Sequence, residues 1–239
     1  MTAEDGSNRD FTTFVRWTIA VLFLVCFTSG CGSSFRRSAD VTESDLASRD
    51  LTRNPRGPWV EIFDGNTLDG WEPEQFNIRG AVQVKDGSLQ FKAGTSFSAL
   101  LWTGKFPTED YEFEVSAMRL SGRDIFCGIL FPVGTNYVSM VLGGWSNSIM
   151  GLSNIDDLNA SENETSRGMS FDNNRWYHVA LRFTEEKIQA WIDDKQVIDQ
   201  ERKGHRISPY PGLEMFAPFG IFTYRTGAAM RDLRIRLLD

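Results

Sequence analysis

Apolar residues recur at every second position along much of the chain after Trp59, and this period restricts the fold more than any other feature. The clearest runs cover residues 111–118, 176–183 and 232–237. A period of two places successive side chains on opposite faces of an extended segment. These runs therefore predict β-strands that bury one face and expose the other.

Less regular strand-like runs fill the space between them. They cover residues 124–133, 135–142, 147–153 and 187–193. Turn pairs such as Asp64-Gly65 and Asp86-Gly87 separate the strands, and no stretch keeps a helical period long enough to predict a major helix. Many short strands at fairly regular spacing indicate a single all-β domain, a sandwich or jelly roll, over residues 58–239.

The composition supports a packed domain and argues against one class of partner. The sequence is 41% hydrophobic and 13% aromatic, which is enough for a core. Its formal net charge is −7, and Lys and Arg form no block. Nucleic-acid binding requires a concentrated basic face, so nucleic acid is not an expected partner.

The N-terminal segment, residues 1–31, is typical of a secretory signal peptide. Its apolar stretch, Trp17 to Phe27, is far shorter than the ~20 residues of a membrane-spanning helix. The stretch ends in Thr28-Ser29-Gly30-Cys31, which resembles the lipobox of bacterial lipoproteins, with Thr28 where that motif usually has Leu. We expect lipidation of Cys31; simple cleavage or an uncleaved anchor are the alternatives.

Residues 32–57 are rich in Ser, Arg, Asp and Thr and predict a disordered tether without a fold of its own. The protein would then be exported to the cell envelope and held at a membrane by its N-terminal lipid, facing the periplasm or the exterior. Of the three cysteines, only Cys127 belongs to the predicted domain. Its apolar neighbours favour a small buried thiol over a reactive nucleophile.

One polar segment, residues 156–174, predicts a long surface loop. Its oxygen-bearing residues Asp156, Asp157 and Asn159 offer ligands that calcium prefers. They lack the spacing of an EF-hand loop, and a solvated loop is the favoured interpretation.

The segment Glu61–Trp71, with the sequence EIFDGNTLDGW, resembles the opening of the 3-keto-disaccharide hydrolase domain family. Further similar segments follow along residues 58–238, at 84–89, 101–103, 110–114, 174–179 and 191–195. The resemblance implies a two-sheet antiparallel jelly roll of the concanavalin A and laminin-G type. It also implies an exported, often lipid-anchored protein that acts on a glycan or keto-sugar.

The resemblance implies a chemistry as well. Members of the family cleave 3-keto-glycosides, by hydrolysis or by elimination across C1–C2 followed by hydration. A ketone at C3 acidifies the proton on C2, so a modest general base can start the elimination. A divalent metal or a cationic side chain would stabilise the enolate, and the cofactor stays open.

The sequence departs from the family where catalysis would be expected. Pro132 stands where the family often has Arg, and Val138 stands where it has Glu. These positions are expected to face the concave sheet, so no catalytic residue transfers from the family to this chain.

The residues themselves offer three weak catalytic candidates. Glu112 and Glu114 share one face of a strand about 7 Å apart, a separation at which two carboxylates can serve glycoside hydrolysis. The alternative is the solvated face of a strand. His178 shares a predicted strand face with Trp176 and Arg182, and His205 lies in a polar loop.

Substrate-binding candidates centre on Trp145, which lies in the glycine-rich segment Gly143–Asn147 and could stack on a sugar ring. Arg123, Asp124 and Arg225 are expected beside the groove. Two functions remain open: an enzyme that cleaves keto-glycosides, and a jelly roll that binds a carbohydrate or a protein without catalysis. A groove with Trp145 and two acids or a histidine favours the first; a groove filled by Phe131, Met140 and Leu142 favours the second.

Overall fold

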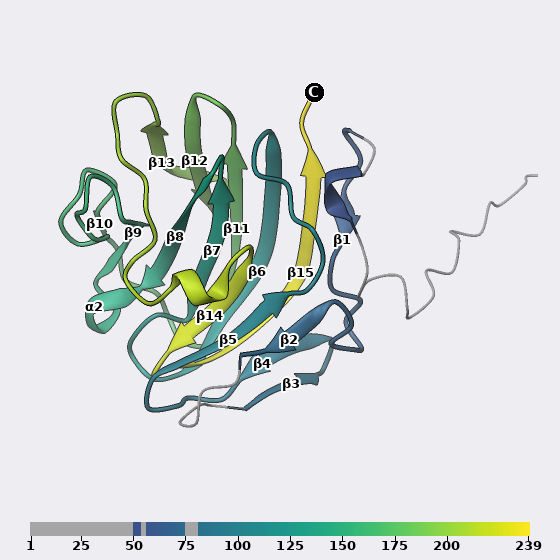
Figure 1. The fold of residues 1–239 in the computed structure, drawn as a ribbon. Helices are drawn as coiled ribbons and strands as arrows, with labels where there is room; N and C mark the ends of the chain where they lie inside the picture. The colour runs from purple at the N-terminus through teal and green to yellow at the C-terminus, as the bar shows by residue number, and fades with distance from the viewer. Residues whose placement is uncertain (1–49, 54–55, 75–80) are drawn as a thin grey trace, which may run out of the picture. The chain divides into compact units, whose positions relative to one another are not determined.

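The structure, a computed structural model, describes residues 50–53, 56–74 and 81–239 (Figure 1). All of them belong to one unit of the chain, Val41–Asp239. The predicted signal peptide with Cys31, and most of the predicted tether, lie outside the described residues. Within the described ranges, no helix has the length and apolar character needed to cross a membrane.

The described residues form two antiparallel sheets. The eight-stranded sheet contains, in spatial order, β13 (Lys195–Glu201), β12 (Lys187–Ile192), β11 (Trp176–Phe183), β6 (Tyr111–Ser121), β15 (Gly227–Leu237), β4 (Ser88–Phe91) and β3 (Val82–Lys85), with β1 (Val60–Glu61) paired to β15. The seven-stranded sheet contains β10 (Arg167–Gly168), β9 (Ile149–Ser153), β8 (Asn136–Gly143), β7 (Cys127–Val133), β14 (Gly220–Tyr224), β5 (Phe97–Trp102) and β2 (Trp71–Pro73).

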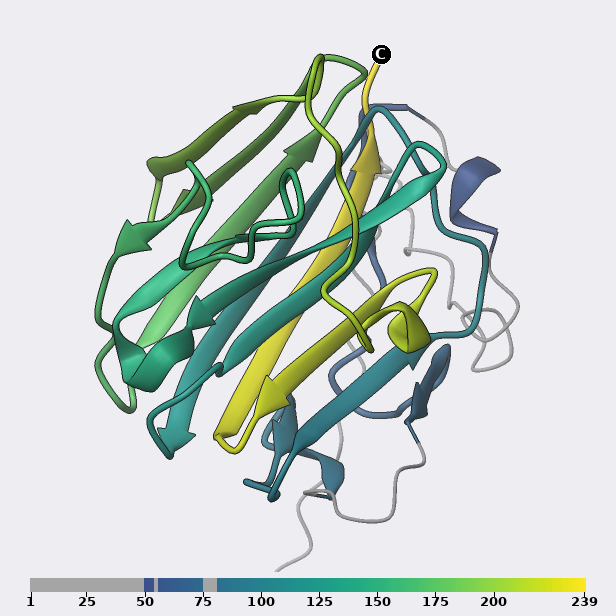
Figure 2. The ribbon, with the colours of Figure 1, turned by 60° about the vertical axis from the view of Figure 1, so that its left-hand side comes forward.

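Within the described residues, helical structure is confined to short turns, namely η1 (Leu51–Arg53), α2 (Gly144–Asn147) and η2 (Glu214–Phe216). Strands far apart in sequence lie side by side, since β6 pairs with both β11 and β15. Figures 1 and 2 show the two sheets packed face to face. The predicted all-β, two-sheet jelly-roll sandwich is therefore confirmed.

The main core lies between the sheets. Alternate residues of β6, beginning with Tyr111 and Phe113, are fully buried and point into it. Phe131, Met140 and Leu142 of the seven-stranded sheet meet them there, each with no exposed surface. Cys127 belongs to the same core, and its burial raises the pKa of the thiol to about 12. The predicted burial of this thiol is confirmed.

The outer face of the seven-stranded sheet is covered as well. Leu130, Val141 and Phe222 point outward and pack against Leu213 and Phe216 in a second, separate hydrophobic cluster. The segment that carries Leu213 and Phe216 crosses over the sheet, as Figure 2 shows in yellow-green. Because β7 and β8 are buried on both faces, they are nearly continuous apolar runs without clear alternation.

The polar segment 156–174 differs from the predicted surface loop. Asn163 and Thr165 are 7% and 1% exposed. The Asn163 amide donates to the Leu152 carbonyl oxygen at 2.7 Å, and the Thr165 hydroxyl oxygen accepts from the Leu152 N–H at 2.9 Å. These side chains satisfy backbone groups of β9, so the middle of the segment is an integral part of the sheet edge. The surface-loop prediction is wrong there.

Candidate functional site

A hollow of about 400 Å³ lies on the outer face of the seven-stranded sheet. Strands β8 and β9 contribute Ser139, Val141 and Ser153, and the covering segments contribute Asn159 and Tyr210. The remaining lining residues are Phe97, Asp124, Ile125, Trp145, Leu213 and Tyr224. Aromatic and small polar groups thus dominate the wall, which is the usual character of a site for a small molecule.

Trp145 lies in a left-handed turn at the edge of this hollow. Trp145 has φ 50° and ψ 55°, Ser146 has φ 60° and ψ 40°, and Asn147 continues the left-handed run with φ 69°. Each such residue other than glycine costs about 1–2 kcal/mol relative to ordinary backbone. Backbone strain of this kind persists where surrounding contacts impose it, and it gathers at functional sites.

The contacts that impose this turn come from Asn147 and Ser148. The Asn147 side-chain amide donates to the Phe171 carbonyl oxygen at 3.0 Å, and its oxygen accepts from the Phe171 N–H at 3.1 Å. The Ser148 hydroxyl donates to the Trp145 carbonyl oxygen at 2.7 Å. The Trp145 side chain, 43% exposed, is therefore displayed at the hollow by a fixed backbone.

Asp124 is the only charged side chain among the described residues that line the hollow. Its Oδ1 accepts a hydrogen bond from the Ile125 N–H at 3.0 Å, and its own N–H lies 3.0 Å from the Thr226 hydroxyl oxygen. Burial raises the pKa of the Asp124 carboxyl, against smaller opposing effects from the Ile125 N–H hydrogen bond and then from the positive charge of Arg225. A half-buried carboxylate of this kind is suited to accept a proton.

The two arginines predicted beside Asp124 do not line the hollow. The Arg225 side chain donates to the Thr95 carbonyl oxygen at 3.1 Å, and its guanidinium lies 5.1 Å from the centre of the Tyr224 ring. Arg225 thus supports the wall from behind Tyr224. Arg123 is exposed at the end of the preceding loop. Of the four binding candidates, the structure brings Trp145 and Asp124 together in the hollow.

Sequence patterns missed several lining residues. Tyr210, 45% exposed, lies in an irregular segment without any period, between two prolines. Phe97 and Tyr224 lie on neighbouring strands with ring centres 4.8 Å apart, a contact that only the strand pairing reveals. The three rings give the hollow aromatic surface beyond that of Trp145.

The weak catalytic candidates lie elsewhere, on the outer face of the eight-stranded sheet. Glu112 is 7% exposed and forms ion pairs with Arg182 and Arg236, so the prediction of a solvated strand face is wrong for it. Glu114 pairs with Arg234 and lies 3.4 Å from His178. Both glutamates border a smaller hollow of about 200 Å³. The main core separates this face from Trp145.

Of the two positions that depart from the family, Pro132 alternates with the core residues Phe131 and Val133 and so lies on the outer face, whereas Val138 differs from expectation. Val138 has no exposed surface and belongs to the core between the sheets, so it does not face the outer sheet surface as predicted. The next residue, Ser139, points outward and lines the hollow. Because side chains alternate along a strand, Phe131, Met140 and Leu142 also point inward and leave the outer face to Trp145.

The proposed calcium ligands are engaged by other side chains. Asp156 lies 2.8 Å from His205, and Asp157 forms an ion pair with Arg206. In the part of the chain that the structure describes, no three His, Cys, Asp or Glu residues gather into a group able to hold a metal ion. The residues of the hollow therefore do not fit a bound divalent metal, and we derive no step through one.

The model of the family described as 3-keto-alpha-glucoside-1,2-lyase-like domain matches residues 58–236. No curated protein sequence matches the chain.

Similar solved structures share the fold at low identity. The carbohydrate binding module CBM66 from Bacillus subtilis is 15% identical over 70% of this chain and 95% of its own, with a TM-score of 0.50. A protein of unknown function with a galectin-like fold from Bacillus subtilis is 10% identical over 72% and 92%, with a TM-score of 0.51. The exoplasmic/lumenal domain of VIP36 is 11% identical over 74% and 87%, with a TM-score of 0.50.

Proposed function

The chain belongs to the 3-keto-alpha-glucoside-1,2-lyase-like domain family, and on that premise we propose that it binds a 3-keto-glycoside in the hollow beside Trp145 and cleaves it there. The observation that carries the proposal is the presence, in one hollow, of a fixed exposed tryptophan and a single half-buried carboxylate, Asp124.

Binding rests on the aromatic wall. Sugar rings present C–H faces that stack on indole and phenol rings, while hydroxyl groups accept and donate hydrogen bonds at the edges. Trp145 and Tyr210 supply exposed ring surface, and Asn159 supplies a polar side chain at the same hollow. The hollow has the size of a small-molecule site, which suits one or two sugar units.

Cleavage rests on Asp124. A simple glycosidase needs two carboxylates, whereas elimination across C1–C2 of a 3-keto-glycoside needs one base. Asp124 takes the proton from C2, and the electron pair of that C–H bond forms an enolate with the C3 ketone. The enolate collapses to the C1–C2 double bond as the C1–O bond breaks, and the departing oxygen keeps the electron pair of that bond and takes a proton from water. The hydroxide that remains takes the proton from Asp124 and restores its carboxylate. The product is a 1,2-unsaturated 3-keto sugar.

A second function is supported by a different observation. No cationic side chain is present in the described lining of the hollow to stabilise the enolate that the elimination forms. A domain of this fold that binds the glycoside without cleaving it fits that absence. The alternative is a carbohydrate-binding jelly roll at the cell envelope.

The two functions separate in one experiment. The purified protein is incubated with a 3-keto-α-glucoside and with the parent α-glucoside, each with and without a chelator, and products are followed by NMR. Release of the leaving group from the keto compound alone, lost in Asp124→Asn, supports the lyase. Saturable binding without release, lost in Trp145→Ala, supports the binding module. Neither binding nor release contradicts both.

We also propose that the protein is exported and anchored through a lipid on Cys31. The proposal rests on the signal-like segment and the Gly30-Cys31 pair. Metabolic labelling with a fatty acid should mark the wild type and not Cys31→Ser, and the wild type should enter the membrane fraction. A Cys31→Ser protein that still fractionates with membranes contradicts the lipid anchor.

A further inference from the structure

Two segments that border the hollow are joined by a short backbone ladder. The Asn154 N–H donates to the Ser208 carbonyl oxygen at 2.6 Å, and the Ser208 N–H donates to the Asn154 carbonyl oxygen at 3.2 Å. The Asp156 N–H donates to the Arg206 carbonyl oxygen at 2.8 Å. The first segment continues to Asn159 and the second to Tyr210, and both of these residues line the hollow.

His205 lies at one end of this ladder between two carboxylates. Its Nδ1 is 2.8 Å from Asp156 Oδ2, and its Nε2 is 3.5 Å from Glu164 Oε1. A neutral imidazole carries one N–H and can donate to only one of these groups, whereas the imidazolium donates to both. Protonation therefore decides whether His205 joins Asp156 to Glu164.

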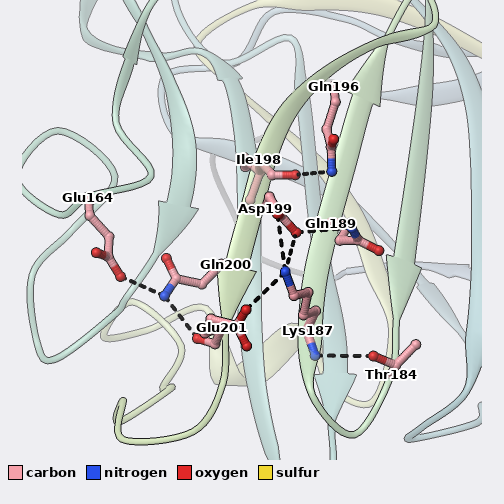
Figure 3. Close-up of polar contacts among 9 residues, drawn as sticks. All are labelled: Glu164, Thr184, Lys187, Gln189, Gln196, Ile198, Asp199, Gln200 and Glu201. Carbon is pink, nitrogen blue, oxygen red and sulfur yellow. Dashed lines mark hydrogen bonds and ion pairs between the residues drawn. The ribbon is translucent and has the colours of Figure 1, made fainter.

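Glu164 is itself fixed to the eight-stranded sheet. Figure 3 shows Glu164 beside Gln200 of β13, whose amide donates to Glu164 Oε1 at 2.6 Å and to the Glu201 carbonyl oxygen at 2.9 Å. The Glu201 carboxylate pairs with Lys187 of β12 at 2.9 Å. A protonated His205 thus connects the rim of the hollow to two strands of the sheet edge.

We propose that His205 is a positioning residue whose protonated form fastens the rim segments 154–159 and 206–210 and thereby strengthens ligand binding in the hollow. The inference rests on the proposed binding of a glycoside at this site. The Asp156 hydrogen bond, followed by the negative charges of Asp156 and Glu164, raises the pKa of His205. The fastening is complete below the ordinary histidine pKa and is lost as the pH rises through the raised value.

Other charged groups also lie around His205. Arg206 pairs with Asp157, and Arg202 pairs with Glu109 at 2.5 Å. Two small hollows border His205, and the remaining charged residues that line them are Arg167, Glu185, Asp199, Glu201 and Lys203. Carboxylates, lysine and arginine all titrate outside pH 5.5–8.5 in their ordinary range. A change within that window is assigned to histidine, and the chain has only two.

The second histidine, His178, supplies a matched control. It faces Glu114 on the outer surface of the eight-stranded sheet, so His178→Gln removes a histidine and an acidic contact away from the hollow. His205→Gln removes the titrating group at the rim. His205→Arg keeps a permanent positive charge with several donors between the same carboxylates.

The test measures amide exchange of residues 154–159 and 206–210 at pH 5.5 and 8.5, corrected for intrinsic exchange, together with affinity for the 3-keto-α-glucoside. In the wild type and His178→Gln, protection and affinity should both fall about two- to fivefold at the higher pH, the range of a partly exposed ion pair. His205→Gln should show the lower protection and the lower affinity at both pH values. His205→Arg should show the higher protection and the higher affinity at both.

The outcomes distinguish the two proposals. Equal protection of the rim at both pH values in the wild type overturns the role of His205, whatever the affinity. A pH-dependent rim that disappears in His205→Gln, in a protein that binds no glycoside, supports the fastening and contradicts the proposed function. A pH dependence that survives in His205→Gln and disappears in His178→Gln overturns the assignment to His205.

Discussion

Glu112 of β6 lies directly opposite Arg182 of β11, with the Glu112 Oε1 2.5 Å from the Arg182 side-chain nitrogen. On its other side, Glu112 is directly opposite Arg236 of β15 and pairs with it as well. The carboxylate thus joins three adjacent strands at the centre of the eight-stranded sheet. Its function is structural, since cross-strand pairs of opposite charge stabilise a sheet.

The substitution Glu112→Gln should lower the free energy of unfolding by about 1–2 kcal/mol, because it weakens hydrogen bonds to charged groups. The Arg182 and Arg236 side chains are 41% and 33% exposed. Screening by solvent therefore keeps the loss of unfolding free energy below that of a fully buried ion pair. Urea denaturation measures the change. The control is Asp199→Asn, which weakens the more exposed ion pair with Lys187 and should lower the free energy of unfolding by less than ~0.5 kcal/mol. Glycoside affinity should be unchanged; a large loss would place Glu112 in the site.

The substitution Trp145→Ala should weaken glycoside binding at least tenfold, or about 1.4 kcal/mol, because it removes the exposed ring at the hollow. Stability should change by less than about 0.5 kcal/mol, since the side chain adds little to the core. Calorimetry with the 3-keto-α-glucoside tests this. Trp176→Ala, on the outer face of the other sheet, is the control and should leave the affinity intact. Equal losses in both variants contradict a site at Trp145.

The rate of cleavage should rise with pH through the raised pKa of Asp124, because the base accepts a proton only when it is ionised. The midpoint of this rise should lie above the ordinary pKa range of an aspartate, on the acidic side of the pH–rate profile. Asp124→Asn should lower kcat/KM by about a hundredfold or more and change binding less than about threefold. A variant that keeps both the rate and the pH profile excludes Asp124 as the base.

The substitution Gly128→Ala should destabilise the domain by about 2–3 kcal/mol through overpacking. Gly128 is the direct cross-strand partner of Phe222, and a Cβ at position 128 would overlap the Phe222 ring. Thermal unfolding measures the loss. Phe222→Leu should recover part of it in the double variant, because the smaller side chain makes room for the new methyl group. Strictly additive losses argue against this contact.

The fold followed from the sequence wherever one face of a strand meets water. Residues 111–118 and 176–183 alternate because their even-numbered side chains point outward from the eight-stranded sheet. The second hydrophobic cluster was missed, since the segment around Leu213 and Phe216 has no period of its own. Its partners Leu130 and Val141 became recognisable only once the strands were paired.

The candidate site was predicted less completely than the fold. Trp145 was found because a large ring inside a glycine-rich turn has no place in a core. The position of Val138 was mistaken, since a shift of one residue along a strand moves a side chain to the opposite face. The burial of Glu112 depends on two neighbouring strands that lie far away in sequence, so no local pattern reveals it.

The separation of the two hydrophobic clusters has a consequence for how such a domain diversifies. Leu213 belongs to the outer cluster, and neither Tyr210 nor Leu213 belongs to the core between the sheets, to which Ile207 and Phe219 on either side contribute. Substitutions of Tyr210 or Leu213 alter the chemistry of the hollow without disturbing the contacts that define the sandwich. The selectivity of the proposed site can therefore drift or be engineered in a few covering residues, at little risk to the scaffold beneath them.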